Sequence, residues 1–439
     1  MRCWLLLLCV FIAARVEGGT ADHVIIISID GLRPEFYLPG GLSTNCPTLV
    51  QMRDSGSYAR QAVSVYPSVT YPAHASIVTG VHPARHGIAA NSKCELPDLE
   101  GRGYWLASDL QVPAIWDVAH AAGLTVGAVS WPSTAGSRAI DWNLPEFWTT
   151  AFGTADQLRA QYATPGLCPM PPKLPADSVA WDARVAECAG EIIRQHQPNL
   201  LLVHFVEPDK VQHQGGRRAP DLPAAMRRVD AHVARLLETT RAAGLHSRTT
   251  VVVLGDHGFS DVKSSLAVNL LLIQDGLITL RDGKITDWKV IVLNTGGSAA
   301  VFLKDPADAK TATRVRALLE RHATDTNGKP LYQIIDRPQL TALGGPRDAA
   351  FYLEAAPGCM FSGSLKGKNL VRRPPIKGNH GYLPDKPESR TGLVVMGSGI
   401  KSGVVVDTAR LIDVAPTVAV LLGLKTEGMD GKLIREFLP

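Results

Sequence analysis

The sequence predicts an α/β fold in which a mainly parallel sheet is flanked by helices on both faces. Two observations support this prediction. Short apolar runs rich in Val, Ile and Leu recur along the chain, and helical patterns fall between them. The runs read HVIIISI, LTVGAVSW, NLLLVHFV, TTVVVLG and GLVVMGS, and the helical patterns cover about 176–197, 222–243 and 409–423. Continuous apolar strands of this kind are typical of parallel sheets buried between two helical layers.

Length and composition set the scale of this fold. The chain has 439 residues, which is long for one ordinary domain. Apolar residues make up 45% and charged residues 20%, so a large core is available and wholesale disorder is not expected. The net charge of +4 is small, and no block of Lys and Arg stands out. A nucleic-acid duplex is therefore not an expected partner.

A long segment separates the fourth apolar run from the last polar motif, GNHGY. It covers residues 259–376 and has strand and helix signals of its own: KVIVLN, AAVFLK and PADAKTATRVRALLERH. We expect this segment to form an inserted cap subdomain that interrupts the sheet. Residues 20–258 and 377–439 would then form the main domain.

The N-terminus, MRCWLLLLCVFIAARVEGG, resembles a secretory signal over residues 1–19. Arg2 provides a basic start, Cys3 to Ala14 form an apolar stretch, and small residues follow for cleavage. The stretch is short for a spanning helix, although an uncleaved anchor is the alternative. We therefore expect an exported protein, periplasmic or secreted, with no stable membrane span after removal of the signal. The sequence contains no N-x-S/T sequon, which favours the periplasm.

Export places the cysteines in an oxidising compartment. The odd number after the signal allows at most two disulfides and one free thiol, and none of the cysteines is in a CxxC arrangement. Cys168 and Cys188 are near each other in the chain and are the favoured pair. The five cysteines are Cys46, Cys94, Cys168, Cys188 and Cys359.

Acidic residues follow three of the apolar runs. Asp30 ends HVIIISID, Asp209 ends NLLLVHFVEPD, and Asp256 and His257 follow TTVVVLG. Open α/β sheets bind their ligands beyond the carboxyl ends of the strands. Asp30 alone could simply begin an Asp-Gly turn. In GDHG, however, adjacent Asp and His between glycines suit ligation better than packing.

Two histidines complete the set of polar residues. His213 follows Asp209 by four residues, which places both on one helical face, and His380 lies in GNHGY. Taken singly, a solvated pair and a structural histidine are the alternatives. Taken together, three Asp and three His could give two divalent ions three ligands each. Nitrogen and oxygen ligands without cysteine suit catalytic zinc, and two ions can stabilise an in-line displacement at phosphorus.

Thr70 lies between two prolines in PSVTYPAHASIVTG. Pro72 is well placed to open a helix, so Thr70 would lie at a helix N-terminus, where negative charge is favoured. An ordinary N-cap threonine is the alternative. Beside a metal cluster, Thr70 is predicted to be a nucleophile, because a bound metal would lower the pKa of its hydroxyl.

The ordered motifs resemble those of the nucleotide pyrophosphatase/phosphodiesterase family, within the alkaline phosphatase superfamily. They read SIDG, SVTYPAHASIVTG, HGIAAN, WPS, EPDKVQH, GDHG and GNHGY, and the tail DVAPTVAVLLGL is also similar. The resemblance runs from about residue 22 to about residue 431. It implies an alkaline phosphatase-like catalytic domain, formed by the two parts of the main domain, that binds two zinc ions per chain.

The resemblance also implies a division of the ligands between the two ions. One zinc would be bound by Asp209, His213 and His380. The other would be bound by Asp30, Asp256 and His257, together with the hydroxyl of Thr70.

Other residues of the motifs would contact the substrate. Asn91, in HGIAAN, would donate a hydrogen bond to a phosphoryl oxygen, and Tyr71 would pack on a nucleotide base. The chain departs from the family in two places that hold substrate side groups. His204 replaces a tyrosine common in nucleotide-cleaving relatives, and WPST at Trp131 to Thr134 replaces WPGS. The metal chemistry is unaffected, but a preference for nucleotides does not follow.

The predicted function is that of an exported, metal-dependent phosphoric diester hydrolase. Thr70 would attack phosphorus in line, and water would then hydrolyse the phospho-threonine. The substrate would be a small molecule such as a nucleotide, a dinucleotide or a phospholipid head-group diester.

Three alternatives remain. A phosphomonoesterase or a phosphonate hydrolase would need a further cation, and Arg138 is the only one in residues 130–142. A non-catalytic binding protein on the same scaffold would be expected to lose ligands, whereas all six candidates and Thr70 are present.

Overall fold

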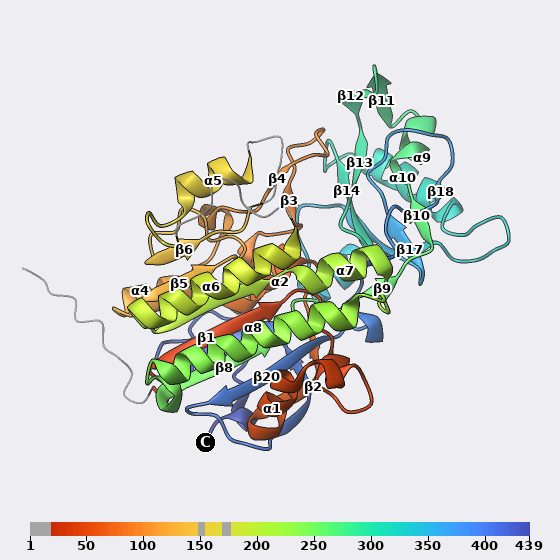
Figure 1. Cartoon of the computed structure of the whole chain (residues 1–439). Coiled ribbons are helices and arrows are strands. Elements are labelled where there is room, and N and C mark those ends of the chain that lie inside the picture. Colours follow the sequence, from red (N-terminus) through yellow and green to blue (C-terminus); the bar gives the residue numbers. More distant parts are fainter. Residues whose placement is uncertain (1–18, 148–153, 169–176) are drawn as a thin grey trace, which may run out of the picture.

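A computed structural model describes residues 19–147, 154–168 and 177–439, and an eight-stranded sheet lies at the centre of this part of the chain (Figure 1). The strand order is β21-β2-β20-β8-β1-β7-β5-β6. Neighbouring strands are parallel except at β20, which is antiparallel to both β2 and β8. The predicted signal, residues 1–19, lies outside the described residues except for its last residue. The strands are β1 His23–Ile29, β2 Ser57–Val63, β5 Val126–Val129, β6 Trp142–Leu144, β7 Leu200–Phe205, β8 Thr249–Leu254, β20 Thr391–Gly397 and β21 Val405–Arg410.

The five apolar runs form the central strands of this sheet, as predicted. The sequence did not reveal β2, β6 and β21. The sequences of β2 and β21, SYARQAV and VVDTAR, mix polar with apolar residues because both strands are partly exposed. The edge strand β6 has only three residues, which is too short for a periodic signal.

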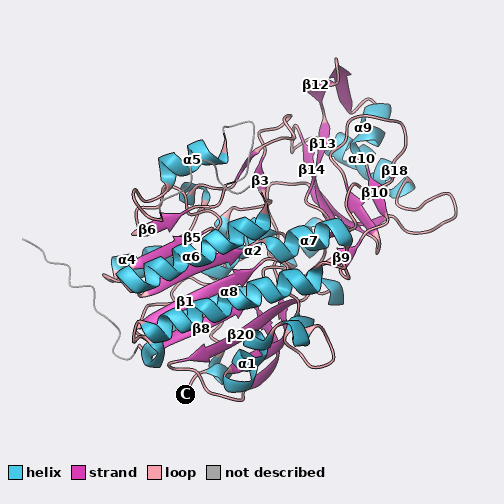
Figure 2. Ribbon diagram, viewed as in Figure 1, coloured by secondary structure: helices cyan, strands magenta, loops and turns pink. Residues whose placement is uncertain are grey.

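Helices cover both faces of the sheet (Figure 2). In β1, Val24 and Ile26 face one hydrophobic core, and Ile25, Ile27 and Ile29 face the other. The first core contains α2 (Thr70–Thr79), α4 (Ile115–Ala121) and α12 (Val414–Leu421). The second contains α1 (Pro47–Ser55), α6 (Ser178–His196) and α8 (Leu222–Ala242). The predicted fold class is confirmed.

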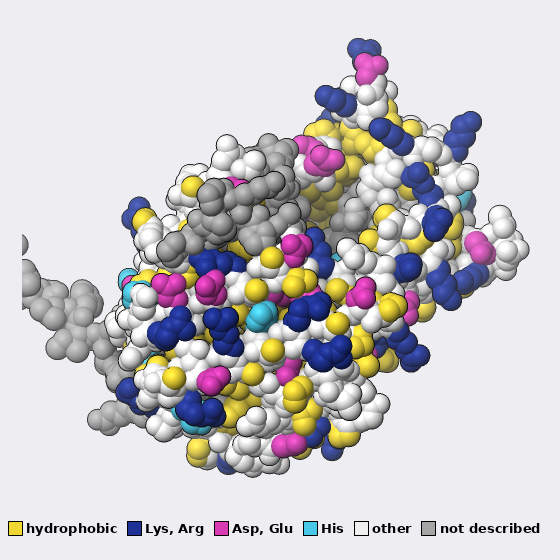
Figure 3. All heavy atoms as spheres, viewed as in Figure 1, with side chains coloured by type: hydrophobic (Ala, Val, Ile, Leu, Met, Phe, Trp, Pro, Cys, Tyr) yellow, Lys and Arg dark blue, Asp and Glu magenta, His cyan; other side chains and the backbone are white. Residues whose placement is uncertain are grey.

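The two long helices α6 and α8 lie side by side across one face of the sheet (Figure 1). The side chain of Asp177 caps α6 by accepting a hydrogen bond from the Ala180 N–H at 2.9 Å. The outer face of both helices carries interspersed acidic and basic side chains (Figure 3), so these helices are amphipathic. Within the described ranges, no helix combines the length and the apolar character needed to span a bilayer.

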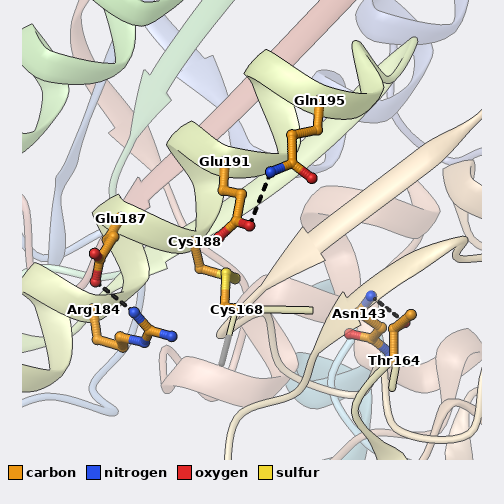
Figure 4. Close-up of a disulfide and its surroundings, with 8 residues drawn as sticks. All are labelled: Asn143, Thr164, Cys168, Arg184, Glu187, Cys188, Glu191 and Gln195. Carbon is orange, nitrogen blue, oxygen red and sulfur yellow. Dashed lines mark hydrogen bonds and ion pairs between the residues drawn. A yellow bond between two sulfur atoms is a disulfide. The ribbon is translucent and has the colours of Figure 1, made fainter. Parts of the chain in front are cut away.

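The predicted disulfide between Cys168 and Cys188 is present (Figure 4). The Cα atoms are 5.5 Å apart, within the range that a disulfide requires. The bond ties the segment before α6 to the middle of that helix. The other cysteines of the described chain, Cys46, Cys94 and Cys359, are free thiols.

The segment after β8 forms a second, smaller unit with its own hydrophobic core (Figure 1). Its main sheet is antiparallel, in the order β13-β14-β16-β15, and the predicted strands KVIVLN and AAVFLK correspond to β13 and β14. The predicted helix corresponds to α10. The domain boundaries at residues 259 and 376 stay a prediction. The elements are β9 Ser260–Asp261, β10 Ser264–Leu266, α9 Asn269–Gln274, β11 Ile278–Arg281, β12 Lys284–Trp288, β13 Val290–Asn294, β14 Ser298–Leu303, α10 Ala309–Arg321, β15 Tyr332–Ile335, α11 Arg337–Ala342, β16 Phe351–Ala355, β17 Cys359–Phe361 and β18 Val371–Arg372.

Candidate active site

The carboxyl ends of three neighbouring strands bring the acidic residues together. Asp30 directly follows β1, Asp256 and His257 follow β8, and Asp209 lies on α7 (Glu207–Gly215), which follows β7. Because β1 pairs in parallel with both β7 and β8, these ends meet at the same edge of the sheet.

One potential metal site consists of Asp209, His213 and His380, whose ligand atoms lie within 4.8 Å of one another. Asp209 Oδ1 is 3.3 Å from His213 Nε2 and 3.6 Å from His380 Nε2. Asp209 and His213 lie one turn apart on α7, and His380 directly follows β19 (Gly378–Asn379). The structure thus brings together the three residues that the sequence analysis assigned to one ion.

A second potential metal site joins Asp30 and His257 to Asp209. Asp30 Oδ1 and Asp256 Oδ2 each lie 3.2 Å from His257 Nε2. Asp30, Asp256 and His257, three of the residues assigned to the second ion, are therefore adjacent, but Asp209 takes the place of Asp256 in this group. The Asp209 carboxylate lies between the two sites and belongs to both groups.

Main-chain carbonyls orient two of the histidines. His213 Nδ1 is 2.9 Å from the Gly378 oxygen, and His257 Nδ1 is 3.1 Å from the Gly258 oxygen. A carbonyl only accepts, so each Nδ1–H must donate and each Nε2 keeps its lone pair for the acidic cluster. Metal-binding histidines are commonly oriented in this way.

The charges of the cluster fit a divalent cation. Asp30 Oδ1, Asp209 Oδ1 and Asp256 Oδ2 have no hydrogen-bond partner among the described residues, although buried oxygens normally have one. Burial raises the pKa of Asp30, and the neighbouring Asp256 and Asp209 carboxylates raise it further. Burial and the nearby His257 lower the pKa of His380, so this ligand is neutral. A bound cation would partner the oxygens and offset their mutual repulsion.

Thr70 is the first residue of α2, and its Oγ1 lies 3.4 Å from His257 Nε2. The helix begins two residues before Pro72, where the sequence had suggested it would open, but Thr70 remains at the N-terminus. His74, one turn later, donates from Nδ1 to the Thr70 carbonyl at 2.8 Å. Burial lowers the pKa of His74 to about 3, so a neutral imidazole supports the backbone at Thr70.

Asn91 lies beside the start of α2. Its Oδ1 accepts a hydrogen bond from the Tyr71 N–H at 3.0 Å. With Oδ1 engaged, Asn91 can offer a ligand its Nδ2 donor, as expected for a contact with a phosphoryl oxygen.

Tyr71 and His204 differ from expectation, because both side chains are fully buried. The Tyr71 hydroxyl donates to Glu146 Oε2 at 2.8 Å, and no face of the ring is open to a base. His204 lies inside β7 opposite Ser28 of β1, which keeps its ring within the protein. His204 Nε2 is 3.3 Å from Asp30 Oδ2, so His204 contacts a predicted metal ligand instead of solvent.

Sequence reasoning missed Asp182, which fixes the start of α7. Its carboxylate accepts hydrogen bonds from the Val206 and Glu207 N–H groups, each at 2.9 Å. These bonds hold the helix that carries Asp209 and His213. Asp182 is one of several acids inside a helical pattern, and no sequence signal distinguishes it.

Glu354 was also missed, and it joins the segment before Thr70 to the segment after His380. It lies on β16 and is 1% exposed. Glu354 Oε1 accepts from the Leu383 N–H at 2.9 Å and pairs with Lys386, while Oε2 accepts from the Tyr66 hydroxyl at 3.3 Å. Tyr66 precedes Thr70 in the chain, and Leu383 and Lys386 follow His380.

The Glu354 carboxyl should make stability depend on pH. Burial raises its pKa from 4.5 to about 7, although Lys386 favours the charged form. A carboxyl whose pKa is raised on folding contributes its full stabilisation below its pKa in the unfolded chain. This stabilisation is lost as the pH rises through the folded-state pKa of about 7. We expect wild type to lose roughly 3 kcal/mol more unfolding free energy than Glu354→Gln between pH 4.5 and 8. Urea unfolding of metal-free protein measures this difference, and parallel pH profiles would contradict it.

Comparison with known proteins supports the motif reading. Residues 24–383 match the profile of the family described as type I phosphodiesterase/nucleotide pyrophosphatase. Murine ectonucleotide pyrophosphatase/phosphodiesterase 5 superposes with a TM-score of 0.69 at 19% identity, covering 95% of this chain and 100% of that one. A second murine structure, an inactive threonine-to-alanine variant in complex with AMP, has a TM-score of 0.68 at 18% identity. These likenesses confirm the alkaline phosphatase-like fold.

Curated relatives match over part of their length. Ectonucleotide pyrophosphatase/phosphodiesterase family member 3 of Rattus norvegicus is 25% identical over 251 residues, which cover 55% of this chain and 25% of the relative. Venom phosphodiesterase CdcPDE of Crotalus durissus collilineatus is 24% identical over 253 residues, which cover 56% and 27%. The match thus spans about a quarter of these longer proteins. Since the family profile covers more than half of the chain, the protein belongs to the type I phosphodiesterase/nucleotide pyrophosphatase family.

Proposed function

We propose that this protein is an exported two-zinc phosphodiester hydrolase with Thr70 as its nucleophile. The observation that carries the proposal is the position of Thr70. Its hydroxyl lies at the N-terminus of α2, 3.4 Å from His257, beside two adjacent groups of potential metal ligands. A hydroxyl, six nitrogen and oxygen ligands and a helix N-terminus together suit displacement at phosphorus.

Asp209, His213 and His380 would bind one zinc, and Asp30, Asp256 and His257 the other. Zinc bound there would lower the pKa of the Thr70 hydroxyl and of water, and would offset the negative charge of the phosphoryl group. Carbonyl-held His213 and His257 present Nε2 in a fixed orientation, which reduces the reorganisation needed on binding.

The chain's own residues carry the reaction as follows. Thr70 Oγ forms a bond to phosphorus and loses its proton, while the ester oxygen leaves and takes up a proton. Water then attacks the phospho-threonine, its hydroxyl stays on phosphorus, and Thr70 Oγ recovers a proton. The Asn91 Nδ2 group and the Thr70 N–H, the first of α2, stabilise the charge on the phosphoryl oxygens.

The murine relative supports both the nucleophile and the kind of substrate. Its threonine-to-alanine variant is described as inactive and binds AMP. A nucleotide, a dinucleotide or a phospholipid head-group diester is the substrate class we propose. The ring of Tyr71 is fully buried and offers no stacking face to a base, so it does not favour a nucleotide over the other two substrates.

Export is supported by the chemistry of the chain. The disulfide between Cys168 and Cys188 suits an oxidising compartment, and the relatives are named as ecto- or venom enzymes. We propose periplasmic or secreted localisation.

Diesters should be preferred over monoesters. A monoester carries a second negative charge, which needs a further cation, and Arg138 is the only one in residues 130–142. Arg138 is exposed and lines a surface cavity with Gln111, Asp117 and Ser137. The predicted metal ligands all belong to the described residues, and none of them lines that cavity. We expect a preference of about 100-fold in kcat/KM for a nitrophenyl diester over the matched monoester, roughly 2.7 kcal/mol of transition-state binding.

The control is Arg138→Ala, in which this ratio should hardly change. A monoester preference in wild type that collapses in Arg138→Ala would assign the site to a phosphomonoesterase. Failure to hydrolyse any diester or monoester, with two zinc ions bound, would favour a binding protein.

A further inference from the structure

We propose that Glu354 is a positioning residue that holds the nucleophile segment and the His380 segment in register across the cap. The inference rests on the proposed function, because it assigns Thr70 and His380 to the same reaction. Glu354 belongs to the cap's main sheet, yet its polar contacts run to Tyr66, Leu383 and Lys386 of the flanking segments.

The cap is built directly against the His380 segment. The Gly297 N–H donates to the His380 carbonyl at 2.8 Å. Gly296 has φ +87°, and a Cβ atom at this position would lie 2.4 Å from the same carbonyl oxygen. The turn between β13 and β14 therefore fixes the backbone that carries a predicted metal ligand, and only glycine allows this approach.

The His380 segment in turn holds the segment before Thr70. The Gly381 N–H donates to the Ser68 carbonyl at 2.9 Å, and the Ser68 hydroxyl donates to the Tyr382 carbonyl at 2.7 Å. Tyr66, two residues before Ser68, reaches Glu354 through its hydroxyl. The cap sheet, the His380 segment and the nucleophile segment thus form a closed ring of contacts, and Glu354 on the cap sheet bonds to both of the other two.

Lys386 is the reason why position 354 requires a carboxylate. Its ammonium pairs with Glu354, donates to the Ala355 carbonyl at 3.1 Å and lies 5.1 Å from the centre of the Tyr382 ring. Since Glu354 is almost fully buried, loss of the Lys386 ammonium favours the neutral carboxyl, and loss of the Glu354 charge leaves the ammonium without its partner. A neutral residue of the same shape at position 354 would keep the hydrogen bond from Leu383. It would weaken the contact with Lys386 and so the closed set of contacts between the three segments.

The experiment compares wild type with Glu354→Gln and Lys386→Met. We expect each variant to lower kcat by between about 10- and 100-fold, with KM for a nitrophenyl diester changed by less than about 3-fold. Zinc affinity, measured by competition with a fluorescent chelator, should fall by about 10-fold. In the double variant, kcat and zinc affinity should fall little further than in either single variant, because both substitutions break the same contact.

The matched control is Asp336→Asn, which breaks the ion pair between Arg316 of α10 and Asp336 at the start of α11. It should leave kcat and zinc affinity unchanged even where thermal stability falls. The proposal is overturned if Glu354→Gln and Lys386→Met lower only the melting temperature and keep wild-type kcat and zinc affinity.

Two further outcomes are separable. If Glu354→Gln does not fold, Lys386→Met decides, because the Lys386 side chain is 26% exposed and its loss is tolerated more easily. If wild type hydrolyses no diester, the proposed function fails, and the zinc affinities alone then decide whether Glu354 positions His380.

Discussion

Thr70→Ala is expected to lower kcat for any diester substrate on the order of 10⁴-fold or more. The Thr70 hydroxyl is the protein group that the proposed reaction joins to phosphorus, and its Oγ1 lies 3.4 Å from His257 Nε2. The zinc content should stay close to that of wild type, because six other ligands remain. Single-turnover kinetics and metal analysis of the same preparations measure both quantities.

Two variants sharpen this result. Thr70→Ser keeps a hydroxyl and should restore much of the activity. Thr79→Ala removes the last threonine of the same helix, whose hydroxyl donates to the Ala75 carbonyl at 2.6 Å, and should leave kcat within about 2-fold of wild type. Near wild-type turnover in Thr70→Ala would mean that water attacks phosphorus directly, and the phospho-threonine would have to be abandoned.

Removal of zinc should abolish turnover altogether, and restoring two zinc ions per chain should recover it. In the stripped protein, the Asp30, Asp209 and Asp256 carboxylates repel one another at the carboxyl ends of β1, β7 and β8. Chelated protein should therefore also melt at a lower temperature than the loaded protein. Metal content, turnover and melting temperature along a zinc titration check this expectation.

Magnesium provides the control for this titration. It prefers an octahedral shell of oxygens and binds imidazole poorly, so it should restore little activity to a site with three histidines. Recovery of activity by magnesium alone, or full activity after chelation, would contradict the zinc assignment.

The sequence was most informative where chemistry and strand pattern coincide. β1, β7 and β8 are continuous apolar runs, so the acids that follow them could be placed at the carboxyl edge of a parallel sheet from the sequence. The spacing of Asp209 and His213 places both on one face of α7, as observed. The position of Thr70 at a helix N-terminus was predicted from the neighbouring prolines and from the helical segment that follows it. These features depend on neighbours in the sequence.

Features that depend on distant contacts could not be predicted in the same way. Tyr66 and Glu354 are 288 residues apart in the chain, and neither lies in a motif. Asp182 lies on α6, and it accepts hydrogen bonds from the start of α7 only because α6 packs beside α7. The burial of Tyr71 and His204 is likewise a property of the packed sheet and its loops, so a motif match alone placed both at the substrate.

The pairing of the central strands has a consequence for how the chain folds. β1 pairs with β7 and β8, which come much later in the sequence, and β8 pairs on its other side with β20, beyond the whole smaller unit. The middle of the sheet therefore cannot grow from a local hairpin, and long loops must close before the strands gain contacts. Until β20 is available, the apolar edge of β8 lacks its partner and is open to pairing with other chains. We expect refolding to be slow and to give soluble protein only when the concentration of unfolded chains is kept low.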